Sequence, residues 1–104
     1  MIDWTQVARL RADLGAEVFP EIAEAFLTEL ETQAAALDAP AAAPDIMKDR
    51  FHTMKGSALY LGFAALADAC AGAERATQEH AELAPHIDRI RSLRAASAAA
   101  FRAG

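Results

Sequence analysis

The fold is decided by the stretch HTMKGSALYLG, residues 52–62, and by the residues that lead into it. Apolar residues recur here at steps of three and four, the spacing of one buried stripe on an α-helix. The stripe consists of Met47, Phe51, Met54, Ala58 and Leu61, which fall within about 80° of one another at about 100° per residue. On the same helix His52 lies roughly 140° and Gly56 roughly 180° from the centre of the stripe. We therefore predict a helix that buries the stripe and exposes His52.

The length and composition of the chain favour a single helical domain. With 104 residues, the chain is long enough for one compact core and too short for two, so we expect one domain over residues 1–104. Hydrophobic residues make up 54% of it, and much of that share is alanine, which favours closely packed helices over a sheet. Only five glycines and four prolines are present, as expected of a bundle with few loops.

The composition also excludes several classes of protein. The formal net charge of −5 argues against non-specific binding of nucleic acid, which relies on a basic surface. No uninterrupted apolar run approaches the roughly 20 residues of a membrane span, and no signal peptide is evident. The single cysteine, Cys70, excludes an internal disulfide and suits a reducing compartment, so we expect a cytoplasmic protein.

The apolar periodicity predicts five helices. A short one begins at the cap Asp3, and four longer ones cover about residues 17–37, 45–61, 63–78 and 85–101. The second should bury Phe19, Ile22, Phe26, Leu30 and Leu37. The third should begin with Asp45 as its N-cap and end at Gly62, and two prolines make residues 38–44 a loop. This pattern predicts an all-α fold, an antiparallel up-down four-helix bundle with a short additional N-terminal helix.

Two features single out His52 as a candidate site. Gly56 stands four residues after it, and therefore beside it on the helix surface. A glycine inside a helix costs about 1 kcal/mol relative to alanine, but here it would clear a path to the imidazole. The only two lysines of the chain, Lys48 and Lys55, stand four residues before and three residues after His52. They form a cationic patch that could offset the charge of a phosphoryl group, unless they are simply two solvated charges.

An exposed apolar rim would suit the docking of another protein at this site. Leu59 lies close to one turn beyond Gly56 on the His52 side, where the core does not need it. Leu27, at the edge of its own helical stripe, is expected to join this rim. The predicted partner-binding surface therefore comprises Leu27, Lys48, Lys55, Gly56 and Leu59.

The remaining reactive side chains indicate no site of their own. Cys70 falls within the apolar stripe of the fourth helix, so we interpret it as an inert core thiol. His80 and His86 have no acidic or cysteine partners at metal-ligand spacing, and we interpret both as surface residues. The sequence has no glycine-rich phosphate loop, so neither a metal nor another cofactor is expected.

The stretch around His52 resembles the signature of a known family. Its residues His52, Lys55, Gly56 and Ser57, followed by Leu61 and Gly62, are similar to the H-x-x-K-G-[ST] … L-G pattern of histidine-containing phosphotransfer (HPt) domains. The resemblance covers about residues 18–74 and includes Phe26-Leu27 in the second helix and Leu66, Cys70 and Glu74 in the fourth. Phe51 departs from the pattern, which usually has a small residue there; this should alter packing and leave the chemistry in place.

The resemblance implies a phosphorelay intermediate that is not itself an enzyme. His52 would accept a phosphoryl group on Nε2 from the phospho-aspartate of a response-regulator receiver domain and pass it to another receiver, in a pathway with a hybrid sensor histidine kinase. Lys55 would stabilise the phosphoryl charge, Gly56 would give clearance, and Ser57 would help to fix either the helix packing or the imidazole. The receivers would supply the Mg²⁺ and a lysine, and the chain is expected to be a monomer.

Two other classes of function stay open from the sequence. A helical adaptor would bind a partner through the exposed face around Leu59 without any phosphoryl chemistry. A kinase or a metal enzyme would need a nucleotide site or an acidic metal cluster beside His52, and the sequence shows neither pattern. The domain also resembles the phosphorylated N-terminal domain of a chemotaxis kinase, but the start at Met1 and the lack of an attached catalytic region favour a free-standing shuttle.

Overall fold

The computed structural model describes residues 1–37 and 43–104 and contains five helices there, with no strand. The helices are α1 (Trp4–Leu14), α2 (Phe19–Ala36), α3 (Pro44–Leu61), α4 (Ala64–Gln78) and α5 (Ala84–Ala103). The all-α class predicted from the sequence is confirmed. Most of the predicted loop at 38–44 lies outside the described residues. None of the helices in the described ranges is both long and apolar enough to cross a membrane.

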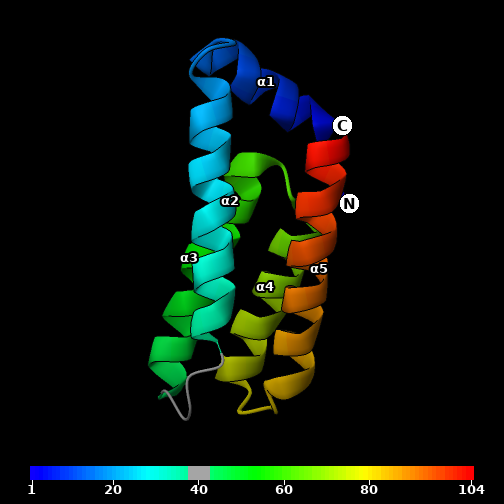
Figure 1. Cartoon of the computed structure of the whole chain (residues 1–104). Helices are drawn as coiled ribbons and strands as arrows, with labels where there is room; N and C mark the ends of the chain where they lie inside the picture. The colour runs from blue at the N-terminus through cyan, green and yellow to red at the C-terminus, as the bar shows by residue number, and fades with distance from the viewer. Residues whose placement is uncertain (38–42) are drawn as a thin grey trace.

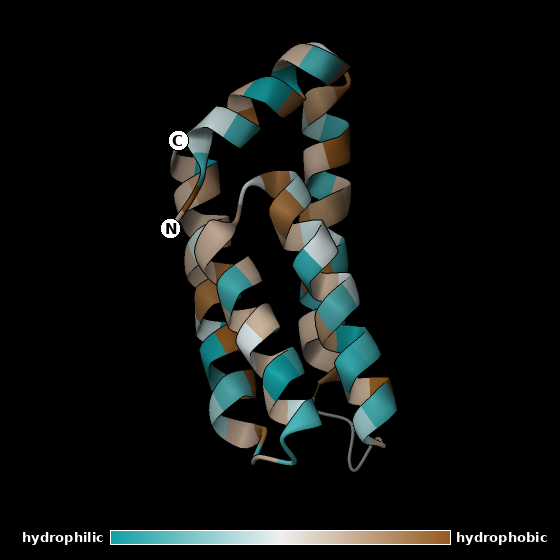
Figure 2. Ribbon diagram, turned by 180° about the vertical axis from the view of Figure 1, so that it is seen from behind, coloured by the Kyte–Doolittle hydropathy of each residue, from teal (hydrophilic) through white to brown (hydrophobic). Residues whose placement is uncertain are grey.

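Four of the helices lie alongside one another, and α1 lies across one end of them (Figure 1). Among the four longer helices, each contacts two of the other three, in the order α2, α3, α4, α5 and back to α2, and α1 contacts α2 and α3. The molecule is accordingly elongated, with extents of 43 × 20 × 20 Å. Hydrophilic and hydrophobic residues alternate along the helices, so each has a polar side and an apolar side (Figure 2).

The core is built around the predicted apolar stripe of α3. All five of its residues are buried, and Phe51, the departure from the family pattern, is fully enclosed. The facing side of α4 is made largely of alanines, with Leu66 and Cys70 between them. Small side chains allow two helices to approach closely, so the large residues of α3 fill the space that the alanines leave. This packing determines which side of α3 faces solvent.

The buried side of α2 differs from the prediction. The residues of α2 that are buried are Phe19, Ala23, Leu27, Leu30 and Ala34. Ile22 and Phe26 are only half-buried, and the ring of Phe26 stacks on Tyr60 with 4.4 Å between centroids. The expectation that Leu27 belongs to an exposed rim is wrong, because its side chain is 5% exposed and lies in the core. The buried side of α2 is therefore centred on Ala23, Leu27 and Leu30, and Phe26 lies at its border.

An aromatic cluster closes the end of the molecule where α1 lies. Phe101, near the end of α5, packs against Trp4, Phe19 and Phe63, with ring centroids 6.5, 6.2 and 5.7 Å away. Aromatic pairs at these separations add to the stabilisation from burial. The cluster therefore ties α1, α2 and α5 to the turn between α3 and α4.

The ends of α3 are set by different residues. Pro44 is its first residue and Ala43 its N-cap, so the prediction that Asp45 caps the helix is wrong. Proline is favoured at that position because it has no N–H to leave unpaired, and Asp45 still places a negative charge in the first turn. The predicted C-terminal cap at Gly62 is confirmed: the residue is left-handed, with a φ of 80°.

Gly62 also joins α3 to the start of α1. Its carbonyl oxygen accepts a hydrogen bond of 2.7 Å from the backbone N–H of Asp3. A Cβ atom at position 62 would lie 2.7 Å from the backbone oxygen of Asp3 and 3.2 Å from the side chain of Val7. Both the left-handed backbone and this close approach therefore require glycine.

We expect Gly62→Ala to lower the free energy of unfolding by at least about 2 kcal/mol, because it adds left-handed strain to a clash with the backbone of Asp3. Urea denaturation followed by circular dichroism measures this change. The matched control is Gly56→Ala, in the open interior of α3, which should instead raise stability by about 1 kcal/mol. Equal stabilities of the two variants would contradict the conclusion that position 62 requires glycine.

Candidate functional site

His52 lies near the middle of α3 on the side that faces solvent. Its side chain is 71% exposed, as the helical stripe predicted. Phe51, the residue before it, is fully buried, so the backbone that carries His52 is held by the core. The imidazole is thus presented from a rigid helix and is accessible to another molecule.

Gly56 leaves open space beside the imidazole. A Cβ atom built at this position meets nothing within 4 Å outside the local helix backbone. Gly56 lies inside α3 and has no left-handed backbone, so neither packing nor conformation requires glycine there. The clearance that the sequence predicted next to His52 is present.

A carboxylate from α4 joins His52 and Lys55. Oε1 of Glu74 lies 3.3 Å from Nδ1 of His52 and 3.2 Å from Nζ of Lys55. The side chain of Glu74 is only 15% exposed, while that of Lys55 is 27% exposed. The imidazole of His52, the carboxylate of Glu74 and the ammonium group of Lys55 therefore lie together on the flank of α3 that packs against α4.

The apolar pattern of single helices did not predict that Glu74 lies beside His52 and Lys55. Glu74 was named only as part of the family resemblance. The signal available in the sequence is its position four residues after Cys70, on the side of α4 that carries the buried stripe. A charged residue near a buried stripe needs a partner. Which partner it finds depends on how α4 packs against α3, and the sequence of α4 does not contain that information.

The two contacts of Glu74 are close but poorly aligned. Neither has the geometry of a hydrogen bond, and within the described residues Oε1 is enclosed without a hydrogen-bond partner. Catalytic hydrogen bonds are often long or poorly aligned in unbound proteins and tighten when the reactant binds. Because the ring of His52 is largely exposed, a modest rotation would align Nδ1 with the carboxylate.

The two nitrogens of His52 therefore have different surroundings. Nδ1 faces the carboxylate of Glu74, and Nε2, across the ring, does not. In a neutral imidazole one nitrogen carries the proton and the other carries a lone pair. A carboxylate next to Nδ1 favours the proton there and leaves the lone pair on Nε2, which can then act as a nucleophile.

The other residues singled out in the sequence lie at different distances from this cluster. Leu59 is 54% exposed and lies on the same side of α3 as His52. Lys48, one turn before His52, is half-buried and lines a hollow with Thr77 and His80. Ser57 is about 140° around the helix from His52, and its hydroxyl donates a 3.4 Å hydrogen bond to the backbone oxygen of Thr53. The structure therefore does not bring Ser57 to the imidazole.

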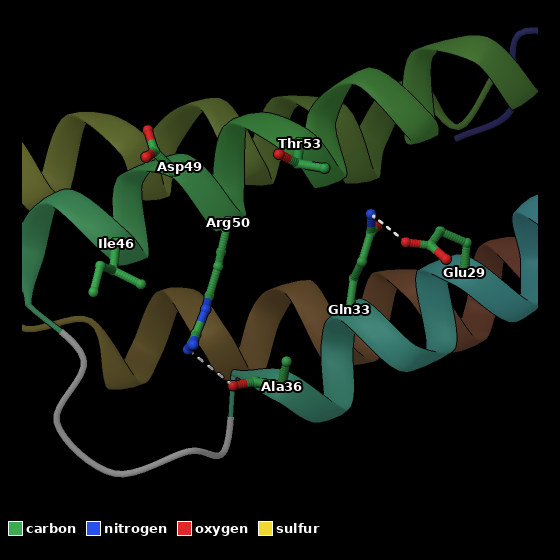
Figure 3. A pocket seen from close by; sticks show the side chains of 7 residues that line it. All are labelled: Glu29, Gln33, Ala36, Ile46, Asp49, Arg50 and Thr53. Atoms are coloured by element: carbon green, nitrogen blue, oxygen red, sulfur yellow. Dashed lines mark hydrogen bonds between the residues drawn. The ribbon is translucent and has the colours of Figure 1, made fainter.

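A groove of about 320 Å³ lies between α2 and α3 (Figure 3). Its lining comprises Glu29, Gln33, Ala36, Ile46, Asp49, Arg50 and Thr53. Inside it Arg50 donates a 3.3 Å hydrogen bond to the backbone oxygen of Ala36, and Gln33 donates one to Glu29 (Figure 3). His52 does not line this groove. The carboxylate that contacts His52, that of Glu74, belongs to α4, on the other flank of α3. The imidazole of His52 is thus exposed on the surface of α3 and does not lie in this groove.

Cys70 is the buried thiol expected from the sequence. Burial and, to a lesser extent, the nearby charge of Glu74 raise the pKa of Cys70 to about 12, although the charge of Lys55 acts in the opposite direction. The thiolate is therefore scarcely populated near neutral pH. Within the described residues, no group of three or more His, Cys, Asp or Glu side chains could hold a metal ion.

Comparison with known proteins gives one family. The family model described as Hpt domain matches residues 18–100. The match begins just before α2 and ends within α5, so it includes all four of the longer helices and the cluster around His52. Neither the curated proteins nor the solved structures contain a match to the chain.

We expect the thiol of Cys70 to react with an aromatic disulfide at pH 8 at least about 100-fold more slowly in the folded protein than in urea, because its pKa of about 12 suppresses the thiolate. Since the pKa of Cys70 is higher in the folded chain than in the unfolded one, its stabilising effect is complete below about pH 8.5 and declines as the pH rises towards 12. Reaction in native buffer as fast as in urea would show that the thiol is not enclosed.

Proposed function

The chain belongs to the Hpt domain family, and from that premise we propose that His52 is the residue that carries the phosphoryl group. Hpt domains are phosphotransfer intermediates of two-component phosphorelays and interact with receiver domains. One observation supports the assignment to His52 above the others: its imidazole is 71% exposed on a helix whose neighbouring position, Gly56, is open.

The proposed reaction uses the free lone pair of Nε2. This nitrogen attacks the phosphorus atom of an aspartyl phosphate on the receiver, and the P–O bond breaks with its electrons leaving on the aspartate carboxylate. The reverse step passes the phosphoryl group from Nε2 to the aspartate of a second receiver. Transfers of this kind depend on in-line approach and on neutralisation of the phosphoryl charge. The receiver supplies the Mg²⁺ and lysine that the family pattern implies, so this chain needs no nucleotide or metal site.

The surroundings of His52 suggest a role for each neighbouring residue. Lys55 places an ammonium group near the imidazole, where it can offset the negative charge of the phosphoryl group. Gly56 gives the receiver access, and Leu59 and Lys48 supply apolar and cationic contacts to it. Ser57 acts in the proposal only through its hydrogen bond within α3. Leu27 has no part in it, because this side chain is buried.

The proposal also covers the domain organisation, the partners and the cellular location of the protein. The ring of contacts among α2, α3, α4 and α5 supports a single domain over residues 1–104 with an antiparallel four-helix bundle at its centre. The partners are response-regulator receiver domains and a hybrid sensor histidine kinase, and the chain is a monomer in the cytoplasm. The net charge of −5 and the lone buried cysteine support that setting.

The second candidate is an adaptor without phosphoryl chemistry. The observation that favours it is the exposure of Leu59, whose 54% exposed side chain could contact a partner whether or not His52 reacts. An adaptor would bind its partner equally well when the imidazole is replaced. The two candidates therefore differ in what they require of His52.

We expect His52→Gln to abolish phosphoryl transfer from phosphorylated receiver domains, because glutamine keeps the size and hydrogen bonding of the side chain but lacks the nucleophilic nitrogen. The measurement is a transfer screen with purified receivers, with the unchanged chain beside the variant. Binding to the same receivers should fall by less than about tenfold, since the docking surface persists. Transfer that survives in the variant would refute the assignment of His52, and binding without any transfer in the unchanged chain would favour the adaptor.

We expect Gly56→Met to slow transfer from receivers by at least about tenfold, because a side chain there would occupy the space next to the imidazole. Phosphorylation by a small phosphoramidate, which needs no docked protein, should change by less than about threefold. Rates of phosphohistidine formation from the two donors provide the comparison. The matched control is Ala95→Met, at an exposed position of α5, which should affect neither rate. Equal losses with both donors would show that the glycine does not serve access.

A further inference from the structure

A hollow of about 270 Å³ lies where α3 begins and α4 ends. This is the end of the molecule opposite α1 (Figure 1). Two basic side chains from different parts of the chain line it, Lys48 from α3 and His80 from the turn after α4. The rest of the lining comprises Pro44, Asp45, Thr77 and Gln78. The hollow is therefore a cluster of charged and polar side chains separate from the one that contains His52.

His80 occupies a backbone position that favours glycine. Its φ is 55°, and among the described residues no other residue except glycine has a positive φ. The N–H of His80 donates a 3.4 Å hydrogen bond to the carbonyl oxygen of Thr77. The N–H of Ala81 donates one of 2.9 Å to the carbonyl oxygen of Ala76. Helix ends with this pattern usually have glycine at the left-handed position, as α3 has at Gly62. Here the chain has an imidazole instead, and it lines the hollow.

The charge of the hollow depends on His80. Lys48 is half-buried and forms no ion pair among the described residues, and Asp45, which is exposed, carries the opposite charge. Because these two charges cancel, the lining is neutral when His80 is neutral and has one positive charge when His80 is protonated. Histidine changes charge between about pH 5 and pH 8. The protonated hollow is thus a local attraction for an anion on a chain whose net charge is −5.

The other charged groups near His80 do not line the hollow. Glu79 and Glu82 lie on the same turn and are exposed, and no carboxylate forms an ion pair with His80 within the described residues. Arg75 is exposed in the last turn of α4, and His86 lies in the first turn of α5. His86 changes charge over the same pH range as any histidine, so it provides a control for effects that do not involve the hollow.

The hollow is close enough to His52 for one partner to cover both. Lys48 lies one turn before His52, and Asp45 lies seven residues before it, or about 10 Å along α3. A standard interface covers about 800 Å² on each partner, which corresponds to a circle about 16 Å in radius. Pockets that enclose small molecules are usually larger than this hollow, at about 300 to 1,000 Å³. Its size and place therefore suit a single side chain of a docked protein.

We infer that the hollow lined by Lys48 and His80 is a second docking point, which receives an acidic side chain of the receiver domain that docks at His52. The inference rests on the proposed function of His52. The ammonium and imidazolium groups would each donate a charge-assisted hydrogen bond to the carboxylate. Receivers with an aspartate or glutamate at the matching position then bind more tightly than receivers without one, so the hollow contributes to the choice of partner.

The test compares the full chain with His80→Asn, because asparagine tolerates the left-handed backbone and carries no charge. The probe is the receiver domain that exchanges phosphoryl groups with His52 fastest in the transfer screen, and the Kd is measured at pH 5.5 and pH 8. We expect His80→Asn to bind at least about threefold more weakly than the unchanged chain at pH 5.5, and equally at pH 8, where His80 is neutral. The ratio at each pH cancels the titration of His52 and of the receiver.

Two further variants show that the charge is responsible. His80→Lys keeps a cation at every pH, so it should bind the receiver at least about threefold more tightly than the unchanged chain at pH 8. The matched control His86→Gln removes the other histidine near this end of the molecule and should leave the Kd unchanged at both pH values. A Kd that changes as much in His86→Gln as in His80→Asn would refute the inference.

The outcomes separate this inference from the function on which it rests. A receiver that exchanges phosphoryl groups with His52, yet binds His80→Asn as tightly as the unchanged chain at pH 5.5, overturns the docking role of the hollow alone. If no receiver exchanges phosphoryl groups with the chain, the proposed function fails and the inference fails with it.

The remaining candidate for the hollow is a small anion, and NMR of the unchanged chain distinguishes it. We expect the receiver to shift the ring signals of His80. Signals that respond to millimolar inorganic phosphate but not to the receiver would make the hollow a small-anion site and refute the inference. If His80→Asn fails to fold by circular dichroism, the response of these signals to the receiver decides the question.

Discussion

The structure depends on the burial of one stripe of α3 against α4. Because Phe51 and Met54 are fully enclosed, the rotation of α3 about its axis is set to within a small angle. A shift of one residue would turn the helix by about 100° and bring His52 towards the core. The exposure of the imidazole is therefore a direct consequence of packing on the opposite side of the same helix. The core stabilises the fold and, by the same contacts, keeps the imidazole of His52 at the surface.

The same helix pair also assembles the charged cluster. On α4, Cys70 faces the core and Glu74, one turn later, reaches the edge where α3 exposes Lys55 and His52. One side of α4 thus supplies both an inert thiol inside and a carboxylate at the border. Burial raises the pKa of the Cys70 thiol to about 12, whereas the carboxylate of Glu74 lies 3.2 Å from the ammonium group of Lys55. The site and the core are continuous, and a change in the packing of α4 would affect both.

The surface around His52 fits a protein partner better than a small molecule. The groove between α2 and α3 is hollow but excludes the imidazole, whereas the ridge that carries His52 offers an open position at Gly56 and an exposed Leu59. Small ligands need a cavity that encloses them, while a folded partner can approach a convex ridge if nothing projects from it. Gly56 leaves this surface without a projecting side chain next to His52.

The sequence by itself determined the features that depend on a single helix. The buried stripe of α3, the exposure of His52, the clearance at Gly56 and the cap at Gly62 all follow from periodicity and backbone conformation within a single segment. Only the tertiary structure decided which neighbour lies on each flank: it buried Leu27, placed Ser57 away from the imidazole, and brought Glu74 to Lys55 and His52. These contacts join residues of different helices, and their geometry depends on how closely alanine-lined surfaces approach one another. The periodicity of a single helix does not contain that distance.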